Sequence, residues 1–158
     1  MIDLEHLNKR AKRRFTKYID KGPSIKTDGE GYIYVYYLNT DPHDTFYKIG
    51  RTHRPVDKRL REWKGAKLKM SCKVQYQKYT ERLIHTLLDH VRVYRYLDPE
   101  TKEYYTIWKN TGKPVDPHQE ETKLAAHKKH IEWFKGSWKT LLKPLVFQAL
   151  SIKNEFWV

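Results

Sequence analysis

The chain has 158 residues, about the length of one domain, and its 39% hydrophobic and 14% aromatic content predicts a packed core and excludes wholesale disorder. Its 32 Lys and Arg residues against 19 Asp and Glu give a formal charge of +13, so we expect a polyanionic partner, with nucleic acid as the first candidate. One cysteine, Cys72, excludes an intramolecular disulfide framework and a thiolate-based zinc site, which favours a reducing, intracellular compartment.

The N-terminal segment is strongly basic. Its apolar residues recur at helical spacing over residues 3–20, which predicts an amphipathic helix. The basic face is either a solvated surface or an arm that contacts phosphates, in which case Arg10, Arg13 and Arg14 are candidate nucleic-acid ligands; membrane-surface binding is a third reading. The segment has no apolar signal region, and no run in the chain approaches the roughly 18 apolar residues of a spanning helix. We therefore expect no membrane partner and a cytoplasmic, nuclear or virion location.

Two strands are expected to open the main body. A linker containing Gly, Pro and Ser ends near Gly31, so we expect residues 1–30 to form an appended helix and linker. The string "GYIYVYYL", residues 31–38, predicts a buried strand. The string "TFYKIG", residues 45–50, predicts a second strand that stops at its final glycine, so the two form a hairpin.

Seven further elements complete the prediction. In chain order they are a helix from Pro55 to before Gly65, a strand over 70–77, a helix over 79–92, a hairpin over 103–115, a helix over 117–131, a short strand over 132–134 and a helix over 137–152 kinked at Pro144. Together they predict an α/β fold of the α+β type, with a small three-stranded sheet, antiparallel or mixed, flanked by helices. The main domain is expected over residues 31–134, with the C-terminal helix of 135–158 packed on it.

Four short strings in the main domain resemble the motifs of the GIY-YIG nuclease superfamily. They are "GYIYVYYL", "YKIGRT", "KRLREW" and "ERLIH", followed much later by "EWF". The closest similarity is to the superfamily's phage-type Orf DNA-binding-domain branch, and it covers about residues 31–134. The resemblance implies endonuclease activity on DNA with a single divalent metal, Mg²⁺ or Mn²⁺.

The resemblance also implies which strand residues carry the chemistry. Tyr34 matches the first motif's tyrosine, which lies near the scissile phosphate in the superfamily. Alternation along the strand places Tyr32, Tyr34 and Tyr36 on one face of the sheet. The alternative interpretation of Tyr34 is a tyrosine of the core. In the second motif Lys48 stands where the superfamily name expects tyrosine, a variant that the phage-type branch commonly shows. Tyr47 lies one position too early and is expected on the opposite face. Lys48 is therefore a candidate phosphate ligand, or an ordinary strand lysine.

The remaining candidate residues lie on or near the two helices that follow. By resemblance, Arg59 matches the helix arginine that stabilises charge on the phosphate, and Glu81 matches the carboxylate that holds the metal. His53 and His85 are candidate proton donors to the leaving oxygen. Arg51, Arg54 and Lys58 are expected to contact the nucleic-acid backbone.

Two functions from different classes remain open. The first is a metal-dependent endonuclease; the second is a nucleic-acid-binding module that keeps the fold but has lost turnover. The second is favoured by one departure, because Val93 and Tyr94 stand where superfamily nucleases usually carry an asparagine. The first is favoured by the joint presence of the tyrosine, arginine and glutamate. The sequence makes no prediction about the oligomeric state.

Overall fold

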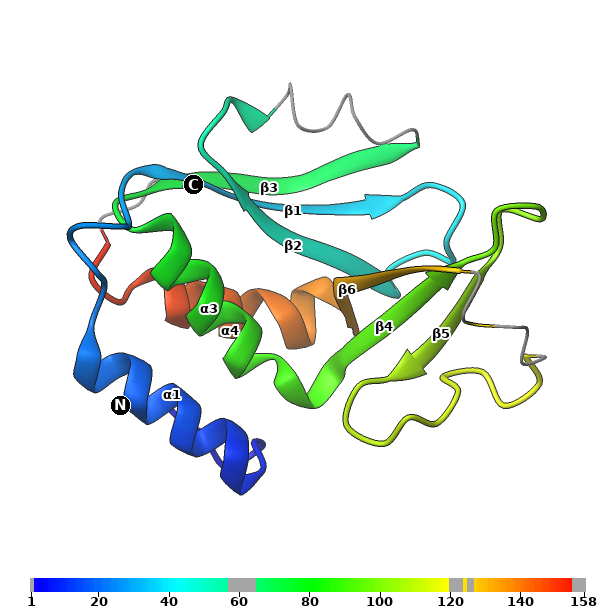
Figure 1. Cartoon of the computed structure of the whole chain (residues 1–158), viewed down its shortest axis with the longest axis horizontal. Coiled ribbons are helices and arrows are strands. Elements are labelled where there is room, and N and C mark those ends of the chain that lie inside the picture. Colours follow the sequence, from blue (N-terminus) through cyan, green and yellow to red (C-terminus); the bar gives the residue numbers. More distant parts are fainter. Residues whose placement is uncertain (1, 57–64, 120–123, 125–126, 155–158) are drawn as a thin grey trace.

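A computed structural model describes residues 2–56, 65–119, 124 and 127–154. These residues form an antiparallel six-stranded sheet with the spatial order β3-β1-β2-β6-β4-β5 (Figure 1). The strands are β1 (Gly31–Leu38), β2 (Phe46–Thr52), β3 (Ala66–Val74), β4 (Arg92–Leu97), β5 (Tyr104–Trp108) and β6 (Lys128–Lys135). The helices are α1 (Lys9–Lys21), α3 (Gln77–Leu87) and α4 (Lys143–Leu150), with a 3₁₀ turn at Asp89–Val91 and a π-type turn at Trp138–Leu142. Among the helices that the structure describes, none has the length and apolarity that crossing a bilayer requires.

The predicted hairpin is confirmed, and its alternation divides the sheet into two faces. Ile33 and Val35 of β1 point toward the helices, together with Ile49 of β2, whereas Tyr34 and Tyr36 point away from them. We call the second side the tyrosine face. Its buried members are Tyr34, Tyr36, Leu38, Val56, Val93 and Trp133.

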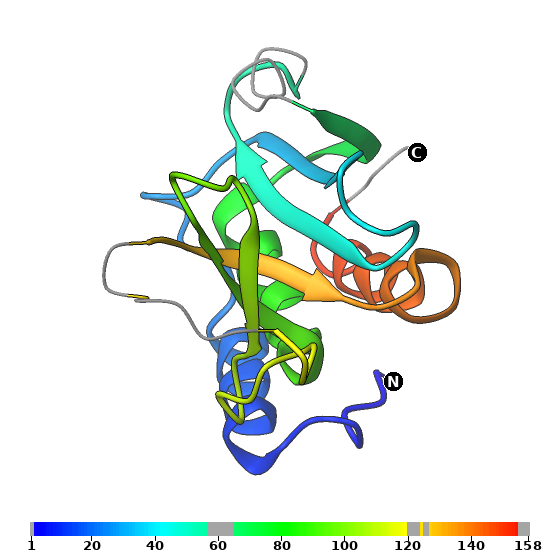
Figure 2. The same ribbon diagram turned by 90° about the vertical axis from the view of Figure 1, so that its right-hand side faces the viewer.

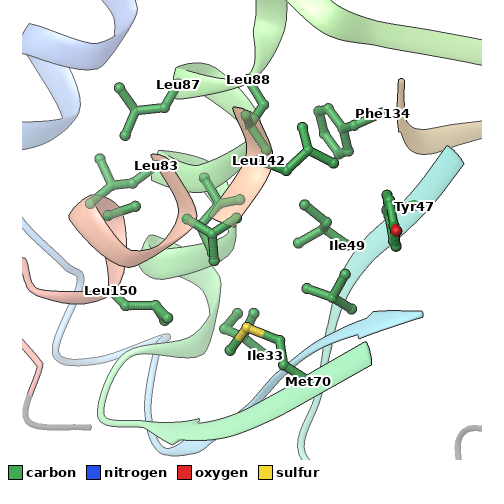
Figure 3. Close-up of a cluster of buried hydrophobic side chains, with 14 of the residues drawn as sticks. Ile33, Tyr47, Ile49, Met70, Leu83, Leu87, Leu88, Phe134, Leu142 and Leu150 are labelled. Atoms are coloured by element: carbon green, nitrogen blue, oxygen red, sulfur yellow. The ribbon is translucent and has the colours of Figure 1, made fainter. Parts of the chain in front are cut away.

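The main core fills the space between the sheet and the helices. Figure 3 shows Ile33 and Ile49 of the strands facing Leu83 and Leu87 of α3 and Leu142 near the start of α4. All five side chains are fully buried. Fully burying an aliphatic side chain contributes about 1.5–3 kcal/mol, so this cluster fixes α3 against the strands. Any functional group on α3 is thereby held at a set position relative to β1 and β2.

The N-terminal helix is packed on the main body. Asn8 caps α1, its side chain accepting a hydrogen bond from the Ala11 amide at 2.8 Å. Ala11 and Phe15 are buried in the main core, and α1 lies beside α3 in Figure 1. The linker has a structural role as well, because the Asp28 carboxylate accepts hydrogen bonds from the Lys78 and Tyr79 amides in the first turn of α3, at 2.9 and 2.8 Å. A residue from outside the helix thus supplies the cap that the sequence of α3 lacks.

The C-terminal segment is helical, as predicted, with an irregularity before its proline. The Leu142 amide donates to the Ser137 carbonyl at 3.1 Å, which is the wide spacing of a π turn. Pro144 follows within the first turn of α4, where its missing amide leaves no bond unmade. The expected disturbance therefore precedes Pro144 as a widened turn.

The prediction of a three-stranded sheet was wrong. Figure 2 shows β4, β5 and β6 extending the sheet beyond β2. Strand β4 was not predicted at all, and β5 pairs chiefly with β4 in place of a hairpin partner of its own. The helix predicted over 117–131 is wrong at residues 128–131, which belong to β6. The predicted strand end at Gly50 was also wrong, because β2 continues to Thr52.

Candidate functional site

Tyr34 lies flat across the second strand. It pairs with Gly50 of β2, and a Cβ added to Gly50 would lie 2.5 Å from the Tyr34 hydroxyl oxygen. The ring also stacks on Tyr36, with centroids 5.5 Å apart and planes at 6°. Glycine at position 50 therefore leaves the room that the phenol occupies, and this explains the glycine of the second motif without a strand end.

Lys48 lies on the same face as Tyr34. It pairs with Tyr36 across the hairpin, is 6% exposed, and its Nζ lies 5.8 Å from the Tyr36 ring centroid. The ammonium also lies 3.9 Å from the Glu132 carboxylate of β6. Tyr47 points to the helix side and contacts Trp138, as the alternation predicts. The lysine is therefore a partly desolvated cation beside the candidate tyrosine.

Strands β2 and β6 separate immediately beyond Lys48. Within the described residues their ladder pairs only Phe46, Tyr47 and Lys48 of β2 with β6, so the edge of β2 from Ile49 onward is open. Arg51 emerges at this open edge, with its Nε 3.5 Å from Glu81 Oε1 and its Nη1 donating to the Gln77 side chain at 3.3 Å. Lys48 reaches the edge from the tyrosine face, and Glu81 reaches it from α3. We call the group formed by Tyr34, Lys48, Arg51, Glu81 and Glu132 the β2 edge site. Tyr34 and Lys48 approach this edge from the tyrosine face, and Arg51 and Glu81 approach it from the helix face.

Glu81 has an unusual electrostatic environment. Burial and the nearby charge of Glu132 raise its pKa to about 7, and Arg51, Arg92 and Lys48 lower it to a smaller extent. Lys48 and Glu132 lie 3.9 Å apart, and both of their charges act on the pKa of Glu81. Glu132 is the functional candidate that the sequence analysis missed, although the string "EWF" marked its position.

The chemistry of the site fits a hard divalent cation. The charge of Glu132 is one cause of the raised pKa of Glu81, and a cation beside Glu81 would relieve that repulsion. In the part of the chain that the structure describes, no group of three or more His, Cys, Asp or Glu side chains is arranged to hold a metal. An ion held by Glu81 would therefore take its other ligands from substrate phosphate and water, which Mg²⁺ readily accepts.

The two candidate histidines differ in position. His85 Nε2 donates to the Ile49 carbonyl at 2.7 Å, so the imidazole satisfies the backbone oxygen that β6 leaves open. Burial lowers the pKa of His85 to about 3, and the ring is therefore neutral at physiological pH. This environment favours a structural role over proton donation. His53 is exposed in the turn after β2.

The other predicted contacts are only partly assembled. Arg14 reaches the buried Asp89 at 3.2 Å, while Arg10 and Arg13 are exposed on α1. Arg54 is exposed just beyond β2, near the open edge. The predictions for Arg59 and Lys58 fall outside the described residues, as does the helix expected after Pro55.

The position of the expected asparagine lies in the core. Of the two residues there, Val93 is fully buried, pairs with Trp133 in the ladder of β4 and β6, and has an aliphatic side chain that offers no hydrogen bond, while Tyr94 is partly exposed. Asn110, the next asparagine, donates to the Asp89 backbone carbonyl at 3.4 Å. None of these residues supplies an amide to the β2 edge site.

Comparison with known proteins identifies the main body. The T5orf172 domain model matches residues 31–148, well over half of the chain. Neither the curated proteins nor the solved structures contain a significant match. The matched region holds all six strands and the whole β2 edge site, and it begins after α1. The chain therefore belongs to the T5orf172 domain family.

Proposed function

We propose that the protein is a metal-dependent endonuclease of the GIY-YIG type that hydrolyses phosphodiester bonds in DNA at the β2 edge site. The family supports the coarse part of this proposal, since T5orf172 domains are phage-type modules related to GIY-YIG and HNH-like nucleases. The observation that carries the finer part is the Arg51–Glu81 pair at the open edge of β2, where the charge of Lys48 also acts on the pKa of Glu81. Tyr34 lies over Gly50 of the same strand, on the sheet face opposite α3. A phenol, an ammonium and a carboxylate are the groups that such hydrolysis uses.

Each residue has a role that follows from its position. Lys48 and Arg51 offer positive charge to a phosphate at the edge, where burial of Lys48 strengthens the attraction. The Tyr34 phenol lies over Gly50 and is 1% exposed, and it would accept or hand on a proton of the attacking water once substrate and water occupy the site. Glu81 would hold Mg²⁺ or Mn²⁺, which supplies Lewis-acid polarisation of the phosphate when bound. Arg51 would then exchange its ion pair with Glu81 for an ion pair with the phosphate oxygens.

A second function has an observation in its favour. Val93 and Tyr94 stand where superfamily nucleases usually carry an asparagine, so one orienting amide is missing. A module that binds nucleic acid without cleaving it would also keep the basic surface. It would not need the half-buried Glu81, whose ionised form is disfavoured in the folded chain.

A plasmid-nicking assay separates the two functions. Supercoiled plasmid is incubated with Mg²⁺ or Mn²⁺ and the wild-type chain, Glu81→Gln or Tyr34→Phe, and binding is measured in parallel with EDTA present. The endonuclease proposal predicts nicking by the wild type only, with loss of at least about 100-fold in each variant, the size typical of a lost acid–base group. Equal, background-level nicking by all three chains, with binding retained, would establish the binding module instead. Glu100→Gln, an exposed carboxylate far along the chain, is the control that should nick like the wild type.

A further inference from the structure

A groove runs between α1 and α3 and opens beside Glu81. We call it the α1–α3 groove. It has a volume of about 250 Å³, and the lining residues that matter here are Arg14 and Tyr18 of α1, Arg51 of β2, and Lys78, Glu81 and Arg82 of α3. Tyr18 follows Arg14 by one turn of α1, and Arg82 follows Lys78 by one turn of α3. Two facing helical ridges therefore form its walls, and the β2 edge site lies at its mouth.

A second hollow adjoins the α1–α3 groove. It has a volume of about 400 Å³, shares Tyr18, Lys78 and Arg82 with the first and extends along the linker to Asp28. The two hollows form one trough along α3 that leads away from Glu81. If the reacting phosphate of a polyanionic chain lies at the β2 edge site, the neighbouring units of that chain can lie in this trough.

The trough is positively charged, and two of its cations can bind an anion without breaking an ion pair. The two acids at the groove, Glu81 and Asp89, already pair with Arg51 and Arg14. Lys78 and Arg82 are exposed, and neither forms an ion pair with any residue that the structure describes. These two cations, together with Arg92 in the same lining, therefore give the groove its attraction for anions.

One wall of the groove carries an aromatic ring. The Arg82 guanidinium carbon lies 5.3 Å from the centroid of Tyr18, and the tyrosine is partly exposed. An aromatic ring beside cations is the arrangement with which proteins stack a base and hold its phosphate. A lipid or acidic peptide surface would have no use for the ring, so nucleic acid fits best.

We propose that the α1–α3 groove binds the sugar-phosphate backbone of the nucleic-acid strand next to the phosphate at the β2 edge site, with Lys78 and Arg82 on phosphates and Tyr18 beneath a base. The proposal rests on the function proposed above for that site. It assigns α1, which lies outside the matched family region, to substrate binding through the groove rather than through a free arm. Only Arg14 of the three predicted α1 ligands lines the groove; Arg13 faces another part of the surface.

Paired charge removals test the groove. We would measure binding of a labelled oligonucleotide by fluorescence anisotropy over a range of salt, in EDTA so that cleavage plays no part. The test variant is Lys78→Ala with Arg82→Ala. The control is Lys139→Ala with Lys143→Ala, two exposed lysines with the same four-residue spacing at the C-terminal helix. Thermal unfolding of both chains checks that each is folded.

The expected result is specific to the groove. The test variant should bind at least about tenfold more weakly, and its slope of log affinity against log salt should fall by roughly 1.4 to 1.8, the contribution of two phosphate contacts. The control should keep the wild-type slope. Equal slopes in the test variant and the control would overturn the proposal.

A thiol tether adds a positional readout. Cys72 is buried, and burial raises its pKa to about 11, so a cysteine placed on the surface is the reactive one. Lys78→Cys should react, by thiol–disulfide exchange that releases a small thiol, with an oligonucleotide whose backbone tether ends in a mixed disulfide, and Lys139→Cys should not. Equal capture at both positions would count against the groove. Groove-specific binding without nicking would contradict the endonuclease proposal and support the groove proposal. Nicking by the wild type, with groove variants that bind normally, would contradict the groove proposal alone.

Discussion

Replacing Glu81 with glutamine is expected to change how the free energy of unfolding depends on pH. Burial and the charge of Glu132 raise the pKa of Glu81 from an ordinary 4.5 to about 7. The folded chain therefore binds this proton more tightly than the unfolded chain does. The Glu81 contribution is most favourable below about pH 4.5, is lost as the pH rises toward 7, and is constant above that.

The magnitude follows from the two pKa values. At about 1.36 kcal/mol for each pKa unit, a change from 4.5 to about 7 corresponds to at most about 3 kcal/mol. Part of that amount belongs to the pair with Glu132, and the Glu81 side chain is 17% exposed. We therefore expect Glu81→Gln to gain about 1 to 3 kcal/mol relative to the wild type between pH 5 and pH 8.

Denaturant unfolding of both chains at pH 5 and pH 8 measures this difference. Glu100→Gln, at an exposed position, is the control and should follow the wild type. At pH 8, Mg²⁺ should raise the melting temperature of the wild type and leave that of Glu81→Gln unchanged, because a ligand that binds only the folded state stabilises it. Parallel pH profiles for the wild type and Glu81→Gln would refute the assigned environment of this carboxylate.

Three further variants test the fold around the site. Arg95 is 2% exposed and donates two hydrogen bonds, of 2.8 and 2.6 Å, to Asp41. Arg95→Met leaves that carboxylate unpaired and should lower the free energy of unfolding in urea by about 3–5 kcal/mol. Adding Asp41→Leu should recover part of the loss. Asp28→Ala removes the cap of α3 and should lower the free energy of unfolding by about 1–2 kcal/mol; an unchanged melting temperature would show that the cap is dispensable. Gly50→Ala places a methyl group 2.5 Å from the Tyr34 hydroxyl and should displace the phenol. We expect the free energy of unfolding to fall by about 1–3 kcal/mol and nicking to be abolished. Normal nicking by a folded chain would contradict the position given to Tyr34.

The first hairpin was predictable because its pattern is local and strong. Alternation along "GYIYVYYL" places Tyr34 and Ile33 on opposite faces whatever the rest of the chain does. Strand β4 was missed because a strand that contains Arg95 reads as polar. That arginine is buried only because Asp41 and the rings of Phe46, Tyr104 and Trp133 surround it. Such an environment is made by tertiary packing and leaves no signal near the residue.

Four of the five members of the candidate site were predictable from the sequence, but Glu132 and the pairings of the site were not. The motif strings named Lys48 and Glu81, yet the partners of both come from residues far away or on other elements. Glu132 meets Lys48 only because β6 pairs with the start of β2 and then separates from it. His85 shows the same dependence, since the Ile49 carbonyl needs its imidazole only where β6 is absent. Sequence spacing contains no information about where two strands part.

The most direct test of a shared site is a double-variant cycle under single-turnover conditions. Cleavage rates of a labelled DNA are measured for the wild type, Tyr34→Phe, Glu81→Gln and the double variant, with Mg²⁺ and enzyme in excess. If the phenol and the carboxylate act on one phosphate, the double variant should be no slower than the slower single variant. Losses that multiply, or single variants that cleave as fast as the wild type, would contradict a common active site at the edge of β2.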